Sequence, residues 1–311
     1  MQLYFVYYHP YTWVVQTNNS DMILITAATS QFGQAAIDHL INLGVPTSEI
    51  TGMVRDLEKA APLKEKGISL VVGDYLDSAS LEKAFAGVDK LLFISSGEVQ
   101  GRSEQHKNVV EAAKAAKVGY IVYTSFYGND YTANSAISMV SESHLKTEAW
   151  LKESGIPHTI LKNTVYMDML PMFIGEQGIA SGTIFQPAGQ GSSSYVLRTE
   201  MAEAAARVLT SEGHAGKVYP ISSAQTWSYE DIAAILTDIL GKPFTYVAPS
   251  AEEFGKAMTE AGVPAAYIGL FTGFALAKAG GELDTPDNTL ETLLGRKPTD
   301  VKTYLSQVYG A

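Results

Sequence analysis

From residue 22 to residue 161 the chain alternates short apolar segments with longer segments whose apolar residues follow helical spacing. The short segments suit buried strands, which we expect at 23–26, 50–54, 69–72, 90–94, 120–124 and 158–161. The longer segments predict helices at 33–43, 57–66, 78–85, 102–117 and 139–154. Strands and helices that alternate at this spacing form βαβ units with right-handed crossovers, so the pattern predicts an α/β fold with a doubly wound parallel sheet.

The turn after the first predicted strand points to a ligand. Residues 22–33 read MILITAATSQFG, and Gly33 opens the first predicted helix. Free backbone N–H groups and the helix dipole meet at such a junction, which is where a doubly wound fold holds the pyrophosphate of a dinucleotide. We therefore expect a Rossmann-like NAD(P)-binding domain over residues 22–165.

The alternation is less regular after residue 161. We expect one strand at 218–221 and helices at 168–175, 200–209, 229–240, 250–261, 265–279 and 299–309. Residues 166–311 are expected to form mainly a smaller C-terminal substrate-binding lobe over the carboxyl ends of the strands, with some segments returning to the Rossmann core.

Composition excludes several classes of protein. The 311 residues carry a net charge of −11 and no cysteine, which disfavours nucleic acid as a partner and excludes disulfides and thiol catalysis. The six histidines show no metal-ligand spacing, so we expect no metal. No apolar run approaches the roughly 18 residues of a membrane span, and we expect a cytoplasmic protein without a membrane partner.

Residues 1–21 differ from the rest, because they are rich in aromatic residues and contain no lysine or arginine. A signal peptide needs a basic start and an unbroken apolar segment, and Pro10 and the tyrosines break that pattern. We expect an N-terminal extension that is not part of the fold, with an added edge strand or an interface arm as the alternatives.

Two side chains at predicted strand ends bear on the choice of cofactor. Arg55 ends the second strand, roughly 20 residues after the turn, where an acidic residue would bind the ribose of NAD and an arginine suits the 2′-phosphate of NADP. Asp74 ends the third strand, and its carboxylate can accept a hydrogen bond from the adenine amino group. The alternatives are a surface cation for Arg55 and a turn residue for Asp74.

Several segments together resemble the NmrA-like atypical short-chain dehydrogenase/reductase family. TAATSQFG, MVRDLEKA, GDYLD, LLFISSGEVQGR, HLKTEAWLKESGI and LKNTVY occur in the order and spacing of that family. Within it the chain is most similar to the bacterial NAD(P)H:quinone oxidoreductases of type 2. The resemblance covers residue 22 to the C-terminus and implies an NADPH-dependent reductase that transfers hydride to a quinone or a similar planar conjugated acceptor.

The resemblance also implies which residues hold NADPH. Together with Asp74 they are the turn residues Ala27, Ala28, Thr29, Ser30, Gln31 and Phe32, then Arg55, the loop Ser95, Ser96 and Gly97, and finally Asn163 and Tyr166. Asn163 and Tyr166 follow the sixth strand and are expected near the nicotinamide and the substrate. We expect Phe126 and Tyr166 to contact the substrate, and the alternative for both is a place in the core.

The turn departs from the family pattern G-A-T-G-Q-L-G at two glycines. Ala27 and Ser30 replace them. Ala27 is compatible with the turn if its φ is negative, whereas Ser30 adds a Cβ near the phosphate and a hydroxyl that can donate to it. We expect weaker cofactor binding, by ~1–2 kcal/mol if the backbone is strained.

The catalytic dyad of ordinary short-chain dehydrogenases is absent, because no tyrosine is followed four residues later by lysine. In the register set by Glu148, Val140 takes the tyrosine position and His144 the lysine position. Alcohol–ketone chemistry is thereby excluded. A reduced quinone instead leaves a phenolate-type oxygen with a conjugate-acid pKa of about 10, which needs little help from a general acid. His144 is the candidate proton donor, and the alternative is a polar helix residue.

A second function stays open, because this broad family hosts regulators as well as enzymes. The altered turn and the absent dyad favour a non-catalytic NADP(H)-binding redox sensor. The similarity to quinone reductases favours the enzyme. The expected partners are a small quinone-like substrate and, in a homodimer, a second copy of the chain.

Overall fold

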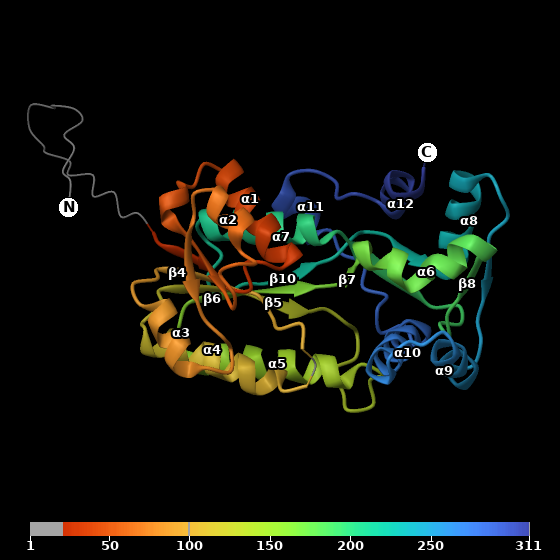
Figure 1. Ribbon diagram of the computed structural model, residues 1–311, viewed down its shortest axis with the longest axis horizontal. Helices are drawn as coiled ribbons and strands as arrows, with labels where there is room; N and C mark the ends of the chain where they lie inside the picture. The colour runs from red at the N-terminus through yellow and green to blue at the C-terminus, as the bar shows by residue number, and fades with distance from the viewer. Residues whose placement is uncertain (1–20, 99, 311) are drawn as a thin grey trace, which may run out of the picture.

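The computed structural model describes residues 21–98 and 100–310 of the chain. Its centre is a parallel sheet of seven strands in the order β10-β6-β5-β4-β1-β2-β3 (Figure 1). The strands are β1 (Ile23–Ile25), β2 (Ile50–Val54), β3 (Ser69–Val72), β4 (Lys90–Phe93), β5 (Tyr120–Phe126), β6 (His158–Asn163) and β10 (Val218–Ile221). The strand order reverses between β1 and β4, so the predicted doubly wound α/β fold is confirmed.

Helices cover both faces of this sheet. One face carries α1 (Gln31–Asn42), α7 (Arg198–Thr210) and α11 (Thr289–Leu294), and the other carries α3 (Ser78–Phe85), α4 (Arg102–Ala115) and α5 (Ser138–Ser154), as Figure 1 shows. A single-turn 3₁₀ helix, Thr47–Glu49, precedes β2. A short helix, α2 (Ala61–Glu65), joins β2 to β3. Each face therefore excludes water, which the continuous apolar character of the parallel strands requires.

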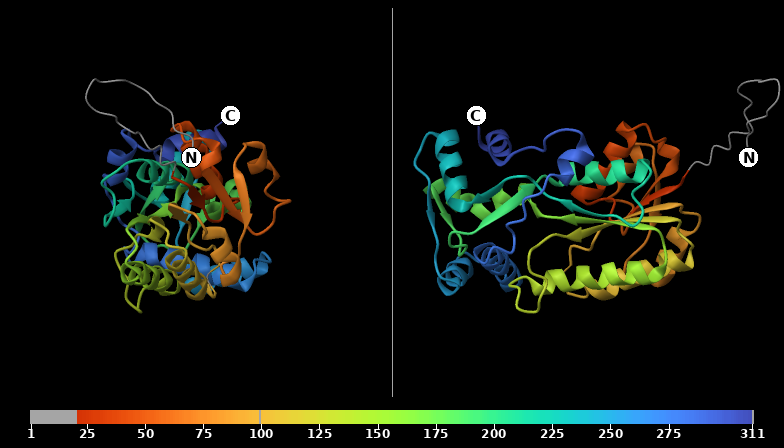
Figure 2. Two further views of the ribbon diagram at one scale, coloured as in Figure 1. Left: turned by 90° about the vertical axis from the view of Figure 1, so that its left-hand side faces the viewer. Right: turned by 180° about the vertical axis from the view of Figure 1, so that it is seen from behind.

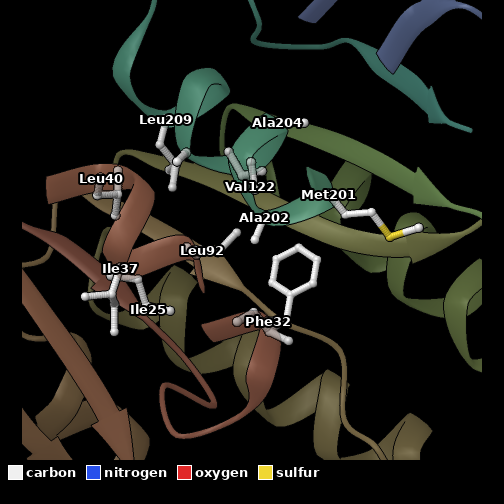
Figure 3. Packing of buried hydrophobic residues seen from close by; sticks show 14 of the residues in the cluster. Ile25, Phe32, Ile37, Leu40, Leu92, Val122, Met201, Ala202, Ala204 and Leu209 are labelled. Atoms are coloured by element: carbon white, nitrogen blue, oxygen red, sulfur yellow. The ribbon is translucent and has the colours of Figure 1, made fainter. Parts of the chain in front are cut away.

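The core above the sheet depends on close contact between α1 and α7. Ile37 and Leu40 of α1 and Ala202 of α7 are all fully buried in one apolar cluster with Leu92 and Val122 of the sheet (Figure 3). A run of alanines in α7 lets that helix lie close to α1 and to the sheet. This helix comes from the second half of the chain, so the core of the sheet is completed by residues far beyond β6.

The C-terminal lobe lies beyond the carboxyl ends of the strands (Figure 2). It contains a three-stranded sheet in the order β11-β9-β7 and a two-stranded sheet of β12 and β8. The strands are β7 (Val165–Tyr166), β8 (Thr183–Phe185), β9 (Ser192–Val196), β11 (Thr226–Ser228) and β12 (Thr245–Val247). The helices are the 3₁₀ turn Met167–Met169, α6 (Leu170–Ser181), α8 (Tyr229–Leu240), α9 (Ala251–Glu260), α10 (Ala265–Ala279) and α12 (Val301–Tyr309).

Several element boundaries differ from those expected. β5 and β6 run two residues further, because Ser125 and Phe126 pair with Lys162 and Asn163 across the ladder. The helix expected at 57–66 is shortened to α2. In contrast, α3 has the expected bounds and is capped by Asp77, whose carboxylate accepts from two backbone amides. Residues 1–20 lie outside the described residues, so the expected extension stays a prediction. Asp21 forms an ion pair with Lys90 at 2.8 Å. No helix in the described ranges is long and apolar enough to span a membrane.

Candidate functional site

A cavity of about 830 Å³ lies at the carboxyl ends of the strands, between the sheet and the lobe. The β1–α1 turn and the ends of β2 to β6 form one side, and side chains of α5, α6 and α10 form the other. This is the crevice in which an open α/β sheet binds its ligand. All the residues predicted to bind a cofactor or substrate line it except Ala28, which is fully buried beneath the turn.

The β1–α1 turn packs so tightly that Gly33 has no room for a side chain. A Cβ on Gly33 would lie 2.5 Å from the carbonyl oxygen of Ala27 and 2.8 Å from the Cα of Ala28. Ala27 itself has φ of +47°, in the left-handed region. The negative φ that would make Ala27 compatible with the turn is therefore not observed. Its Cβ is held at the cost of local strain.

Ser30 has a structural role in place of the glycine. It is the N-cap of α1, and its hydroxyl oxygen accepts a hydrogen bond from the Gly33 N–H at 3.0 Å. Its hydroxyl hydrogen is still available for a ligand. In the described part of the chain, the N–H groups of Gln31 and Phe32 have no hydrogen-bond acceptor. The start of α1 thus offers two free backbone donors at its positive end, the arrangement that binds phosphate.

Arg55 and Asp74 lie at the rim of the cavity. The Arg55 side chain is 72% exposed, and its Nη1 lies 3.2 Å from Oε1 of Glu98 across the entrance. Asp74 accepts the Leu76 N–H at 2.8 Å through its carboxylate, so it serves the turn while it lines the cavity. An exposed arginine with one weak surface partner is accessible to a phosphate group.

The loop after β4 is fixed by the helix and strand behind it. The Ser95 N–H donates to Oγ1 of Thr124, and the Ser96 N–H donates to Nε2 of His106, both at 2.9 Å. Both partners are fully buried. Ser95, Ser96 and Gly97 therefore form a rigid wall of the cavity.

Asn163 is the most unusual group in the cavity wall. Its side chain is only 2% exposed, and neither Nδ2 nor Oδ1 has a hydrogen-bond partner within residues 21–98 and 100–310. A buried amide without partners costs about 1–3 kcal/mol for each unsatisfied group. Tyr166 follows it on β7 and lies beneath the Arg198 guanidinium, 5.0 Å from the ring centre. The amide therefore has donor and acceptor capacity left for a group in the cavity.

The inner end of the cavity is aromatic and contains one histidine. Phe126 is nearly buried and packs edge-to-face on Phe274, with ring centres 6.5 Å apart. His144 lies beside it on α5, and its Nδ1 is 2.8 Å from the Tyr123 hydroxyl. Burial, with the positive charge of Arg102 second, holds the pKa of His144 well below its ordinary value. Both effects favour the neutral imidazole of His144 over the imidazolium.

Two buried cations were not identified from the sequence. Arg102 lines the cavity and is 7% exposed, and its Nε donates to the carbonyl oxygen of Glu98 at 2.9 Å. Lys278 is 2% exposed inside the lobe, where its Nζ donates to the Tyr195 hydroxyl at 2.9 Å and to the Trp227 carbonyl at 2.7 Å. Arg102 stands in the ISSGEVQGR segment, but the burial of a charged side chain leaves no periodic signal.

Comparison with known proteins agrees with this geometry. The model of the NmrA-like family matches residues 19–305. Quinone oxidoreductase 2 of Escherichia coli strain K12 is 36% identical over 288 residues, which are 93% of this chain and 99% of the relative. NAD(P)H azoreductase of Xenophilus azovorans is 29% identical over 251 residues, 78% of this chain and 82% of the relative.

Solved structures show the same similarity in space. The NADPH complex of the E. coli NADPH-dependent quinone oxidoreductase has a TM-score of 0.87 at 36% identity and covers 93% of this chain and 100% of that chain. The NADP(H) complex of Citrobacter sp. triphenylmethane reductase has a TM-score of 0.85 at 37% identity, with 92% and 99% covered. These matches extend through both the sheet and the lobe, so the resemblance found in the sequence is confirmed: the chain belongs to the NmrA-like family.

Proposed function

We propose that this protein is an NADPH-dependent reductase that transfers hydride to a quinone or a similar planar conjugated acceptor, without a Tyr-x-x-x-Lys dyad. The observation that carries the proposal is the unpaired amide of Asn163 in the cavity wall. An amide with both a free donor and a free acceptor is complementary to the carboxamide of nicotinamide. The NADPH-bound relatives that span nearly the whole chain support the same cofactor.

The cavity offers a partner for each part of NADPH. The free N–H groups at the start of α1 suit the pyrophosphate, and Arg55 suits the 2′-phosphate. Ser95, Ser96 and Gly97 form a further part of the cavity wall. When bound, NADPH supplies the hydride.

The inner end of the cavity suits a flat apolar acceptor. Val140, which occupies the position of the dyad tyrosine, is 6% exposed and lines the cavity together with Phe126, Phe173 and Phe274. Aromatic side chains orient a planar ring by stacking or edge contacts and exclude water from it. The chain thus binds and positions the acceptor, and the valine at position 140 cannot protonate it.

The first test is titration of the full chain with NADPH, followed by rapid mixing of the complex with 1,4-benzoquinone. We expect binding and then loss of NADPH absorbance only when the quinone is present. Arg55→Ala should bind NADPH about 10-fold more weakly and NADH unchanged, because the 2′-phosphate loses a charged partner. Lys64→Ala, which removes an exposed cation outside the cavity, is the matched control.

The same experiment separates the reductase from the sensor. Tight NADPH binding without turnover, across several quinones, would favour the non-catalytic redox sensor, which the altered β1–α1 turn also favours. Absence of NADPH binding would contradict both functions.

The Asn163→Leu variant tests the observation on which the proposal rests. Leucine has a similar volume and no polar atoms, so the cofactor-free protein should be stabilised by about 1 kcal/mol or more. NADPH should bind more weakly and raise the melting temperature less than in the wild type. A destabilised cofactor-free variant would show that the amide already has its partners.

A further inference from the structure

A chain of buried hydrogen bonds connects the proposed cofactor loop to the aromatic end of the cavity. It begins at the Ser96 N–H, which donates to Nε2 of His106 at 2.9 Å. Nδ1 of His106 lies 2.9 Å from Oγ1 of Thr147, and the Tyr123 hydroxyl lies 2.8 Å from Nδ1 of His144. His106, Tyr123 and Thr147 are fully buried, so water does not compete for these bonds.

The backbone amide of Ser96 determines the tautomer of His106. An amide N–H can only donate, so Nε2 of His106 is the acceptor and its hydrogen is on Nδ1. This hydrogen is donated to Thr147, whose own hydroxyl donates to the Ser143 carbonyl at 2.7 Å. Burial lowers the pKa of His106 to about 3, so the ring does not take up a second proton.

The tautomer of His106 in turn determines that of His144. The Tyr123 hydroxyl lies 3.4 Å from Nδ1 of His106 and 2.8 Å from Nδ1 of His144. The first nitrogen already carries a hydrogen and cannot accept, and Nδ1 of His144 is the nearer of the two ring nitrogens, so we infer that Tyr123 donates to His144. Burial raises the pKa of Tyr123, which keeps its proton. The only hydrogen on the neutral His144 ring is then on Nε2.

We propose that His144 donates a hydrogen bond, through Nε2–H of its neutral imidazole, to the acceptor oxygen that becomes negatively charged during reduction. The proposal rests on the proposed reductase function. It is carried by the position of His144 in the cavity wall beside Phe126 and by the fixed tautomer. Tyr123 and His106 are positioning residues, since they act through His144.

The reaction balances without proton transfer from His144. A quinone that takes a hydride from NADPH gains two electrons and one proton and becomes the hydroquinone monoanion, while NADPH becomes NADP⁺. The Nε2–H group stabilises the anionic oxygen as a preorganised donor. Water then provides the proton that completes the hydroquinone. A neutral imidazole suits this step, because its Nε2–H group is present at every pH above the pKa of the ring.

The charges around His144 maintain this state. Arg102 faces it from α4 and Lys162 faces it from β6, and the positive charge of each disfavours an imidazolium as burial does. His106 also faces it from α4 and is itself neutral. We therefore expect kcat for quinone reduction to be independent of pH between about 6 and 9. A loss of activity as pH rises through the ordinary histidine pKa, about 6.5, would show that an imidazolium is the active form and overturn the proposal.

Three variants test the donor. His144→Leu removes it, and kcat should fall about 100-fold while NADPH affinity stays within about twofold. His144→Gln keeps an N–H donor and should recover part of kcat. Tyr123→Phe removes the group that fixes the tautomer and should lower kcat, whereas Tyr120→Phe, whose hydroxyl bonds to Thr159 outside the cavity, should not.

Nitrogen NMR of histidine-labelled protein measures the tautomer independently of activity. We expect His144 to carry its hydrogen on Nε2 in the wild type and to lose that preference in Tyr123→Phe. A hydrogen on Nδ1, or full kcat in His144→Leu, would overturn the proposal. If no quinone oxidises bound NADPH in the wild type, the proposed function fails and the role of the donor fails with it, although the tautomer is still measured.

Discussion

At the scale of single residues, Ala27 carries the backbone strain of the β1–α1 turn. Its φ of +47° places a Cβ where only glycine is free of steric cost. Ala27→Gly should raise the free energy of unfolding by about 0.5–1 kcal/mol. Urea denaturation of the cofactor-free protein measures this change.

Ala28→Gly is the control in the same turn. Ala28 is fully buried, its φ is not positive, and its N–H donates to the Met53 carbonyl. Loss of its methyl group should lower the free energy of unfolding by about 1 kcal/mol. If Ala27→Gly is as destabilising as Ala28→Gly, the turn is not strained at Ala27.

The sequence identified the residues at strand ends, because parallel strands bring their carboxyl ends to one edge. Arg55 was found in this way, whereas Ser95 and Asn163 were implied by the resemblance to the NmrA-like family, and all three line the cavity. The features of the site that the sequence did not reveal depend on tertiary contacts. The unpaired state of Asn163 and the burial of Arg102 depend on neighbours from other elements, which no local pattern records.

At the scale of elements, Lys278 connects α10 to the small sheet of the lobe. Its ammonium group lies 4.1 Å from the Tyr229 ring centre and has no carboxylate within ion-pair distance among the described residues. Burial lowers the pKa of Lys278 to about 7, whereas the unfolded chain keeps an ordinary value near 10.4. Between these two values only the unfolded state binds the proton, so the folded state gains stability as pH rises.

We therefore expect the free energy of unfolding of the wild type, measured relative to that of Lys278→Met, to rise by as much as ~4 kcal/mol between pH 7 and pH 10. Denaturant unfolding of both proteins at several pH values measures the difference. Burial raises the pKa of the neighbouring Tyr195 and Tyr229, so these hydroxyls stay protonated over this range. Parallel stability profiles would mean that Lys278 keeps its ordinary pKa.

Elements with local signals were predicted well, and those with only long-range partners were not. β2, β3, β10, α8 and α10 have the expected boundaries. In contrast, β9 contains three serines and pairs with β7 and β11, which lie about 30 residues away on either side. Such a strand is stabilised by its partners, so its own composition does not indicate it.

At the scale of the whole molecule, the sheet is completed by residues that follow the first lobe segments. β10 pairs with β6, and α7 covers α1, although both come after residue 197. A chain that ends at Val165 should therefore expose the apolar face of α1 and unfold without a cooperative transition. Circular dichroism melting against the full chain measures this, and a sharp transition in the fragment would contradict it.

The late arrival of β10 and α7 has a consequence for synthesis. When Asn163 has left the ribosome, β6 has an open edge and the apolar side of α1 has no cover. At roughly 5–20 residues per second, several seconds pass before the covering segments are made. During that interval the nascent chain is a target for chaperones and for aggregation, so yield on strong expression should depend on chaperone supply and on translation rate between β6 and β10.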